Sequence, residues 1–511
     1  MSEFNKKNDS TNDDISSIPE VDENDRAGID AFLANQEGKP VVVVQGLGFV
    51  GGVMSLVCAN AITREYAVIG VDLPTPESYL KICSFNEGEL PLKSSDPKVS
   101  EYFERAREKG NHYATFDPYA YAHADVVIVD VNLDVQKESR AEGELADFEV
   151  DMDPFSKAIT AIVENCKPDV LVVVETTVPP GTCQQIVHPI LRQGLLDRNL
   201  PADQFRLGHS YERVMPGPDY VDSIQNYFRV YSGIDVASAD ATEAFLKTII
   251  RTDEYPLTRL QGTNATEMAK VLENSYRAMN IAFMVEWTRF AEEAGVNIYE
   301  VVNAIRMRDT HNNLMFPGIG VGGYCLTKDP LLASWARSSL FDSKALTQSE
   351  QGVRINDQMP LFAFNFLKDR LLPSDVKGLR VLLLGVSYRG DVGDTRYSPV
   401  ELFCRLLKSN GCEVSAHDYF VNYWTECDME VETSLETALV KNFDVLVLTT
   451  GHSEYRKNKA LLGTLEKTDR CIVYDTLGFF SGAELTGIAE NHQVYVLGRG
   501  DDITSGINLS E

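Results

Sequence analysis

The sequence predicts an α/β protein made of two Rossmann-like doubly wound domains that are joined by a long central helix. Short apolar, β-branched runs alternate with helical segments in the N-terminal and C-terminal parts of the chain, which is the pattern of parallel sheets with crossover helices. Between these parts, apolar residues recur close to i, i+3, i+4 and i+7 from Thr263 to Ala294, which predicts one helix. We expect a capping box of Asn264 and Glu267 at its start and Gly295 at its end.

The apolar runs also predict how the chain is divided. We expect parallel strands at residues 41–44, 66–72, 124–130 and 170–175 of the first domain, and at 380–385, 412–418, 443–449, 471–475 and 493–497 of the second. The predicted division is a disordered acidic leader over 1–38, a first α/β domain over 39–240, a central helical region over 241–372 and a second α/β domain over 373–511.

Composition excludes several classes of partner. The net charge of −29 over 511 residues argues against binding to nucleic acid or an anionic membrane, since either needs a clustered basic face. The nine cysteines form no Cys-x-x-Cys pair and the eight histidines no His-x-x-x-His, so neither a metal site nor a disulfide framework is indicated. The N-terminus has no apolar secretion signal, and no stretch approaches the roughly 20 apolar residues of a membrane span. We therefore expect a cytoplasmic protein.

A glycine-rich turn follows the first predicted strand and opens a helix. Gly46 permits the tight turn, Gly48 lets the backbone approach a pyrophosphate, and Gly51 allows close packing of the helix on the strand. Asp72 ends the next strand about 20 residues later, where it would accept a hydrogen bond from a ribose 2′-hydroxyl and repel a 2′-phosphate. The alternative for Asp72 is a solvated carboxylate at a strand end. The pattern predicts NAD as the cofactor, with contacts from Gly46, Gly48, Phe49, Val50, Gly51 and Asp72.

Cys325 lies in a second glycine-rich segment, residues 320–329, with Lys328 and Asp329 within one turn of it. A thiol and a hydride acceptor in one chain suggest oxidation through a thiohemiacetal and a thioester. Such a loop could supply a cation that lowers the pKa of the thiol. The alternative is a buried cysteine that acts as a small apolar residue.

Three further segments carry candidate polar groups. Glu175 and Thr177 follow a buried strand at the carboxyl edge of the sheet, where they could order a water near a nicotinamide or merely stiffen a loop. Lys270 and Asn274 share one face of the long helix and could donate to an oxyanion, although a solvated face is the commoner meaning of this spacing. Arg396 lies in a glycine-rich turn of the second domain, at residues 388–399, which is a candidate phosphate site.

Together these motifs resemble the nucleotide-sugar 6-dehydrogenases, the UDP-glucose/GDP-mannose dehydrogenase family, over roughly residues 40–500. The resemblance implies an NAD-dependent, four-electron oxidation of the C6 hydroxyl of a nucleotide sugar to the uronate, feeding surface polysaccharide synthesis. It implies that Cys325 is the nucleophile, that Asp329 helps with the proton of the attacking oxygen, that Lys270 and Asn274 stabilise the oxyanion, and that Glu175 orders the hydrolytic water.

The same resemblance assigns the domains and the remaining contacts. The first domain would bind NAD, the central region would form a homodimer or higher homo-oligomer and carry the cysteine loop, and the last domain would hold the UDP-sugar. Thr177 and Lys328 are expected to contact the cofactor, and the expected substrate contacts are Glu212, Arg213, Gly322, Gly323, Tyr324 and Arg396.

Departures from the family patterns leave the sugar open. Residues 322–329 look like those of UDP-glucose dehydrogenases, whereas residues 212–217 and 317–323 look like those of enzymes acting on UDP-N-acetylhexosamines. Position 389 is Arg where the family often has Lys, and position 390 is Gly where Pro is common. Two other functions remain as alternatives: a two-electron hydroxyacid dehydrogenase of the 6-phosphogluconate type, which would need neither Cys325 nor a second α/β domain, and a non-catalytic NAD-binding regulator.

Overall fold

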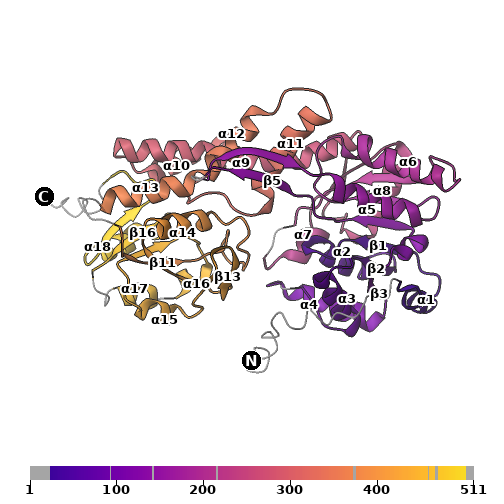
Figure 1. Ribbon diagram of the computed structural model, residues 1–511, viewed down its shortest axis with the longest axis horizontal. Helices are drawn as coiled ribbons and strands as arrows, with labels where there is room; N and C mark the ends of the chain where they lie inside the picture. The colour runs from indigo at the N-terminus through magenta and orange to yellow at the C-terminus, as the bar shows by residue number, and fades with distance from the viewer. Residues whose placement is uncertain are drawn as a thin grey trace. The chain divides into compact units, whose positions relative to one another are not determined.

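The computed structural model describes residues 24–92, 94–140, 143–214, 217–371, 376–458, 460–465 and 470–501 (Figure 1). The chain forms two compact units. The first unit comprises residues up to 134 together with 151–270, and the second comprises residues 135–150 together with the chain from 271 onward. The finer boundaries expected at 240/241 and 372/373 stay a prediction.

The first unit is built on an eight-stranded sheet. Its strand order is β10 (Thr258–Arg259), β9 (Val230–Gly233), β8 (Arg206–His209), β7 (Leu171–Val174), β4 (Val126–Val129), β1 (Val41–Gln45), β2 (Ala67–Val71) and β3 (His112–Thr115). All neighbours pair in parallel except β8 and β9, which are antiparallel. The four strands expected in this domain are confirmed, and the strand order reverses between β1 and β4, where such sheets bind ligands.

Helices cover both faces of this sheet. On one face, Val42 and Val44 pack in a core with α2 (Phe49–Ala59), α4 (Pro97–Lys109) and α8 (Val236–Ile249). On the other face, Gln45 Nε2 donates to the carbonyl of Ala158 in α5 (Asp153–Asn165), at 3.1 Å. The remaining helices of the unit are α1 (Arg26–Ala34), α3 (Pro76–Glu87), η3 (Pro118–His123), η4 (Cys183–Val187), α6 (His188–Asp197) and α7 (Tyr220–Gln225). This is the doubly wound arrangement that the sequence predicts.

Helix α1 corrects the expected leader. Residues 26–34 are helical and Ile29 is fully buried, so disorder across residues 24–38 is wrong. Asp25 anchors the segment, because its carboxylate accepts from Tyr113 Oη at 2.8 Å and from Thr115 Oγ1 at 2.8 Å. Residues 1–23 lie outside the described part of the chain.

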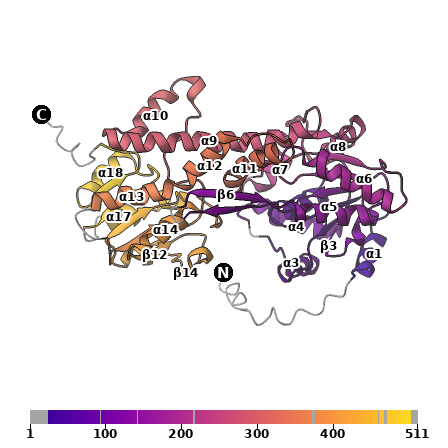
Figure 2. The same ribbon diagram turned by 45° about the horizontal axis from the view of Figure 1, so that its top comes forward.

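The long helix α9 runs unbroken from Thr263 to Ala294, which confirms the expected bounds (Figure 2). Its first eight residues belong to the first unit and the rest to the second. The expected capping box is wrong, because Asn264 already lies inside the helix and Glu267 accepts instead from the backbone N–H groups of Gly181 (2.6 Å) and Cys183 (2.7 Å).

The second unit contains a five-stranded parallel sheet of order β12 (Glu413–His417), β11 (Arg380–Leu384), β15 (Val445–Leu448), β16 (Ile472–Asp475) and β17 (Gln493–Val496), which confirms all the strands expected there. A small antiparallel pair, β13 (Tyr423–Trp424) and β14 (Met429–Glu430), lies beyond β12 in the chain. The helices are α10 (Ile298–Arg306), η5 (Asp309–His311), α11 (Tyr324–Ser339), α12 (Thr347–Asp357), α13 (Met359–Leu371), α14 (Pro399–Ser409), η6 (Thr425–Cys427), α15 (Leu435–Val440), α16 (Ser453–Lys457), α17 (Ala460–Leu465) and α18 (Gly482–Ala489). The strand order reverses between β11 and β15.

A hairpin of β5 (Val135–Ser139) and β6 (Leu145–Val150) follows β4 in the chain but belongs to the second unit. Lys137 Nζ pairs with Asp357 Oδ2 of α12 at 3.1 Å, and Arg354 of the same helix donates to the carbonyl of Leu145. The sequence did not predict this hairpin, because it is largely polar and its apolar ends are too sparse to read as strands.

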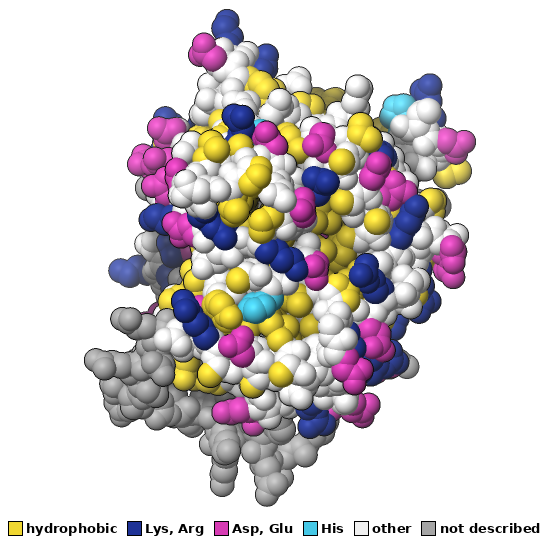
Figure 3. Space-filling view, turned by 90° about the vertical axis from the view of Figure 1, so that its right-hand side faces the viewer, with side chains coloured by type: hydrophobic (Ala, Val, Ile, Leu, Met, Phe, Trp, Pro, Cys, Tyr) yellow, Lys and Arg dark blue, Asp and Glu magenta, His cyan; other side chains and the backbone are white. Residues whose placement is uncertain are grey.

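The surface agrees with the acidic but mixed composition. On the face of the first unit shown in Figure 3, Lys and Arg side chains are interspersed with Asp and Glu. Among the described residues, no helix is both long enough and apolar enough to cross a bilayer.

Candidate active site

The glycine turn after β1 has the geometry of a dinucleotide site. Gly46 has φ +94° and donates its N–H to the carbonyl of Val71 at 2.7 Å, and a side chain there would meet the Asp130 carbonyl at 2.4 Å. A Cβ at Gly51 would lie 1.9 Å from the Gly46 carbonyl oxygen, whereas one at Gly48 would have open space. Gly48 is the N-cap of α2, and the first N–H groups of a helix have no intrahelical acceptors. The turn therefore fits a pyrophosphate group.

Three further residues that are expected to contact NAD, Phe49, Val50 and Asp72, lie in or beside this turn. Asp72 accepts from the N–H groups of Leu47 (3.2 Å) and Leu73 (2.8 Å), which holds its carboxylate beside the glycine turn. The carbonyl of Phe49 accepts from the Tyr220 hydroxyl, and the two rings stack with centroids 4.7 Å apart. Val50 is the second residue of α2. Thr177 lies partly exposed in the loop after β7.

A buried cluster of charged groups lies at the carboxyl edge of the same sheet. Glu175 follows β7 and pairs with Arg229, and the side chains are 3% and 1% exposed. Arg229 reaches this edge because β9 runs antiparallel to β8, so that the start of β9 meets the end of β8. Asp130 follows β4, whose register with β7 places Val129 beside Val174, so Asp130 and Glu175 are neighbours. The sequence did not single out Arg229 or Asp130, since a lone charged residue has no spacing signal.

Burial dominates the electrostatics of this cluster. Burial raises the pKa of Glu175 even though Arg229 opposes the shift. Burial, followed by the charge of Glu175, raises the pKa of Asp130 well above its usual range. Oδ2 of Asp130 and Oε2 of Glu175 are both buried and receive no hydrogen bond from a donor in the described structure. A single proton held between the two carboxyl groups would satisfy both atoms.

Lys270 and the Glu212–Arg213 segment are brought together next to this cluster. Lys270 Nζ donates to the backbone carbonyl of Glu212 at 2.8 Å and to its Oε1 at 3.2 Å. Arg213 lies over the rings of Tyr211 and Tyr227, 5.7 Å from each centroid. Lys270 is buried, with 9% of its side chain exposed, so the solvated-face alternative does not describe it.

In the second unit, Asn274 Nδ2 donates to Asp329 Oδ2 at 2.6 Å, and both residues are buried. Asp329 and Cys325 both lie in α11, whose N-cap Gly323 has φ +79°. Cys325 is exposed in the first turn of α11 and not in a loop, which corrects the expected conformation. A helix N-terminus favours negative charge, so this position suits a thiolate. Lys328 lies over the Tyr324 ring, 4.1 Å from its centroid.

The turn before Cys325 packs directly against the Arg396 segment. A Cβ at Gly322 would lie 2.6 Å from Tyr388 Cβ and 2.7 Å from the Tyr397 carbonyl oxygen, and one at Gly323 would lie 2.6 Å from the Tyr388 ring. The Tyr324 and Tyr397 rings are 6.0 Å apart. Arg396 is 61% exposed and pairs with Asp394 at 2.7 Å. The helix that carries the thiol and the segment expected to hold the nucleotide sugar are thus packed against each other.

The Rossmann sheet with its dinucleotide turn, together with a thiol at a helix N-terminus, defines an NAD-dependent oxidoreductase. Residues 40–249 match the NAD binding domain of the UDP-glucose/GDP-mannose dehydrogenase family, residues 264–358 its central domain and residues 382–481 its UDP binding domain. The chain belongs to this family of dehydrogenases.

Individual relatives and solved structures agree with this family assignment. The chain is 29% identical over 471 residues to the UDP-N-acetyl-D-mannosamine dehydrogenase of Methanocaldococcus jannaschii, covering 91% of this chain and 98% of that one. It is 26% identical over 456 residues to the NDP-N-acetyl-D-galactosaminuronic acid dehydrogenase of Ralstonia nicotianae, covering 87% and 97%. The solved NDP-N-acetyl-D-galactosaminuronic acid dehydrogenase of Methanosarcina mazei is similar in structure, with a TM-score of 0.74 at 26% identity, covering 93% of this chain and 98% of that one.

Proposed function

We propose that this enzyme oxidises the C6 hydroxyl of a UDP-N-acetylhexosamine to the uronate in two steps. The observation that carries the proposal is the packing of the Gly322–Gly323 turn, which leads into Cys325, against Tyr388 and Tyr397 of the UDP binding domain. A nucleotide sugar held by the Arg396 segment would have its sugar close to the thiol. A two-electron hydroxyacid dehydrogenase would have no use for this arrangement.

The chemistry follows from the thiol. NAD bound at the glycine turn supplies the hydride acceptor for both oxidations. The first oxidation gives an aldehyde, and the Cys325 thiolate then adds to its carbonyl carbon to form a thiohemiacetal. Loss of the second hydride leaves a thioester, which water hydrolyses to the carboxylate and the free thiol. The overall reaction consumes one water and releases two hydrides and three protons.

Four polar groups are assigned to these steps. Lys270 and Asn274 are proposed to stabilise negative charge on the reacting oxygen. Asp329, hydrogen-bonded to Asn274, is proposed to help handle the proton of that oxygen. Glu175 is proposed to order the hydrolytic water, with its carboxylate oriented by Arg229.

Two observations support an N-acetylated sugar. The segment of Glu212 and Arg213 resembles that of enzymes acting on N-acetylated sugars, and relatives of this chain are named as UDP-N-acetyl-D-mannosamine and NDP-N-acetyl-D-galactosaminuronic acid dehydrogenases. Gly322, Gly323 and Tyr324 are proposed to line the sugar side, and Arg396 to hold an anionic part of the nucleotide. Asp72, Thr177 and Lys328 are proposed as cofactor contacts. The product would supply polysaccharide synthesis.

A homodimer through α9 is part of the proposal. Exposed apolar side chains recur along the helix at spacings of three, four or seven residues, which is unusual for a solvent-facing helix. They are Met268, Leu272, Tyr276, Phe283, Trp287 and Phe290. The cytoplasmic location expected from the sequence belongs to the same proposal, since the reaction depends on a supply of NAD.

The test is NADH release with UDP-ManNAc, UDP-GlcNAc, UDP-GalNAc, UDP-glucose and GDP-mannose under identical conditions. We expect the highest kcat/KM with one of the three N-acetylated UDP-sugars. Highest activity with UDP-glucose or GDP-mannose would refute the sugar class, and no NADH with any of the five would refute the proposed function.

A further inference from the structure

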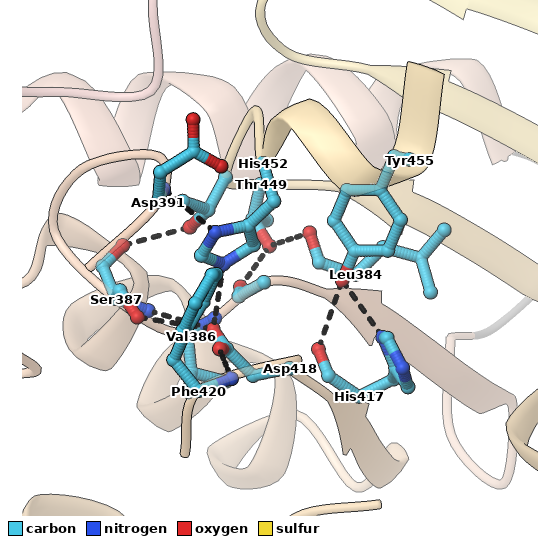
Figure 4. A network of polar contacts seen from close by, with 12 residues as sticks. Leu384, Val386, Ser387, Asp391, His417, Asp418, Phe420, Thr449, His452 and Tyr455 are labelled. Carbon is cyan, nitrogen blue, oxygen red and sulfur yellow. Dashed lines mark hydrogen bonds and ion pairs between the residues drawn. The ribbon is translucent and has the colours of Figure 1, made fainter. Parts of the chain in front are cut away.

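A buried histidine lies at the carboxyl edge of the second sheet, where β11, β12 and β15 end (Figure 4). His452 Nε2 lies 3.0 Å from Asp418 Oδ2, and both side chains are 0% exposed. The same Asp418 oxygen accepts from the N–H groups of Val386 (2.9 Å) and Ser387 (3.3 Å) in the turn after β11. Asp418 therefore joins the end of β12, the first turn of the domain and His452.

The other ring nitrogen of His452 fixes its tautomer. The backbone N–H of Asp391 donates to His452 Nδ1 at 2.9 Å, so Nδ1 is the acceptor and the ring proton lies on Nε2, directed at Asp418. In return, the N–H of Ser453 donates to Asp391 Oδ1 at 2.8 Å. We name this two-way contact of Asp391 with His452 and Ser453 the His452 clip.

The clip holds the segment that contains Arg396. Asp391 has φ +63°, in the left-handed region, which is less favourable than ordinary backbone, and its contacts with His452 and Ser453 help to hold it there. A Cβ at Gly390 would lie 2.5 Å from the Gly451 carbonyl oxygen, so only glycine fits there without a shift of the backbone. Earlier in the same segment, Tyr388 covers Gly322 and Gly323, and its N–H donates to the Asp394 carbonyl at 3.1 Å.

We infer that the His452 clip positions the segment that binds the nucleotide sugar. His452 acts in it as a positioning residue through its Nδ1 contact with Asp391, together with the Ser453 N–H that Asp391 Oδ1 accepts. This role rests on the proposed function. The acceptor at Nδ1 orients the Tyr388–Arg396 segment, and the donor at Nε2 stabilises the fold through Asp418. The two ring nitrogens thus have separable roles. Removing the first should weaken nucleotide binding, and removing the second should lower stability.

The cleanest perturbation is Ser453→Pro. Ser453 is the first residue of α16, where proline is favoured, and His452 before it has φ −63° and ψ 137°, which a following proline allows. The change removes the N–H that Asp391 Oδ1 accepts and leaves the buried core alone. Titration calorimetry with UDP should show about tenfold weaker binding for Ser453→Pro, because a hydrogen bond to a carboxylate is lost. Ser453→Ala, which keeps the N–H, should bind UDP as the wild type does.

A second pair of variants separates positioning from stability. In His452→Asn, the amide oxygen lies near the position of Nδ1 and can still accept from the Asp391 N–H, but the side chain is too short to reach Asp418. In His452→Gln, the amide N–H lies near the position of Nε2 and can still donate to Asp418, but the acceptor for the Asp391 N–H is lost. We expect His452→Asn to bind UDP more tightly than His452→Gln, although His452→Gln should have the higher Tm. A merely structural role would make UDP affinity follow Tm.

The outcomes are distinct. If the wild type binds UDP and Ser453→Pro binds it equally well, the inference is wrong while the proposed function stands. The inference is also wrong if UDP affinity ranks the two His452 variants in the order of their Tm values. Wild-type protein that binds no UDP would overturn both the inference and the proposed function.

Discussion

Two glycines of the dinucleotide turn should differ in how far the same added methyl group destabilises the protein. In Gly51→Ala the Cβ would lie 1.9 Å from the Gly46 carbonyl oxygen, a backbone atom, so the turn must shift. Such overpacking costs about 1–3 kcal/mol of stability. In Gly48→Ala the Cβ meets nothing within 4 Å, so no clash forces the turn to shift. Because alanine is less favourable than glycine at an N-cap, we expect a smaller loss of stability, below about 1 kcal/mol.

The two substitutions should also differ in their effect on NAD affinity. The space beside Gly48 is where the pyrophosphate would approach the backbone, so Gly48→Ala should weaken NAD binding roughly 10–100-fold although the apoprotein loses little stability. Titration calorimetry with NAD and thermal melting of the apoprotein measure the two effects. Gly487→Ala is the matched control: the residue is exposed in α18 and its added Cβ also has open space, so NAD affinity should not change. Normal NAD affinity in Gly48→Ala would refute the assignment of this turn.

Three further predictions concern charged groups. Asp72→Ala should raise the KM for NAD about tenfold and reduce the preference for NAD over NADP, measured as kcat/KM with each coenzyme; an unchanged preference would remove Asp72 from the cofactor site. Arg396→Ala should raise the nucleotide-sugar KM about 10–100-fold and leave the KM for NAD nearly unchanged, and equal effects on both would count against the assigned contact. Burial raises the pKa of Asp130 in the folded protein above its value in the unfolded chain. The protonated carboxyl therefore adds its full contribution to the free energy of unfolding below the ordinary aspartate pKa of about 4, and this contribution is lost as the pH rises through the pKa of the folded state. Asp130→Asn should therefore flatten the fall of Tm with rising pH, and a slope equal to the wild type would contradict the shift.

The parts of the fold that could be predicted are those in which burial leaves a mark on the sequence. The strands β1, β2, β4 and β7 are continuous apolar runs because helices cover both faces, and α9 shows a helical period along its whole length. The strands β3, β8 and β9 were missed because they contain His, Arg and Gly residues among their few positions. Helix α1 was missed because a short helix with one fully buried residue has almost the composition of a disordered leader.

The candidate site was predictable only where its residues form motifs. Gly46 and Cys325 stand in dense local patterns, so their segments can be recognised from the amino-acid sequence alone. Arg229 and His452 stand alone in the sequence. Arg229 reaches Glu175 because β9 is antiparallel to β8, and His452 reaches Asp418 from a turn that follows β15. Neither arrangement produces a regular spacing of residues in the sequence. The partners of Asp130 and Glu175 depend on strand register in the same way.

Counting hydrides per sugar in Cys325 variants tests the two-step oxidation directly. The wild type should release two NADH for each sugar converted to uronate. Cys325→Ser should either stop near one NADH per active site or accumulate a long-lived acyl-enzyme detectable by mass spectrometry, because a serine hydroxyl is far less ionised than a thiol and its ester hydrolyses more slowly. Cys325→Ala should form no net uronate. Uronate formation by Cys325→Ala at the wild-type rate, with two NADH per sugar, would contradict the thiohemiacetal mechanism and the role assigned to the N-terminus of α11.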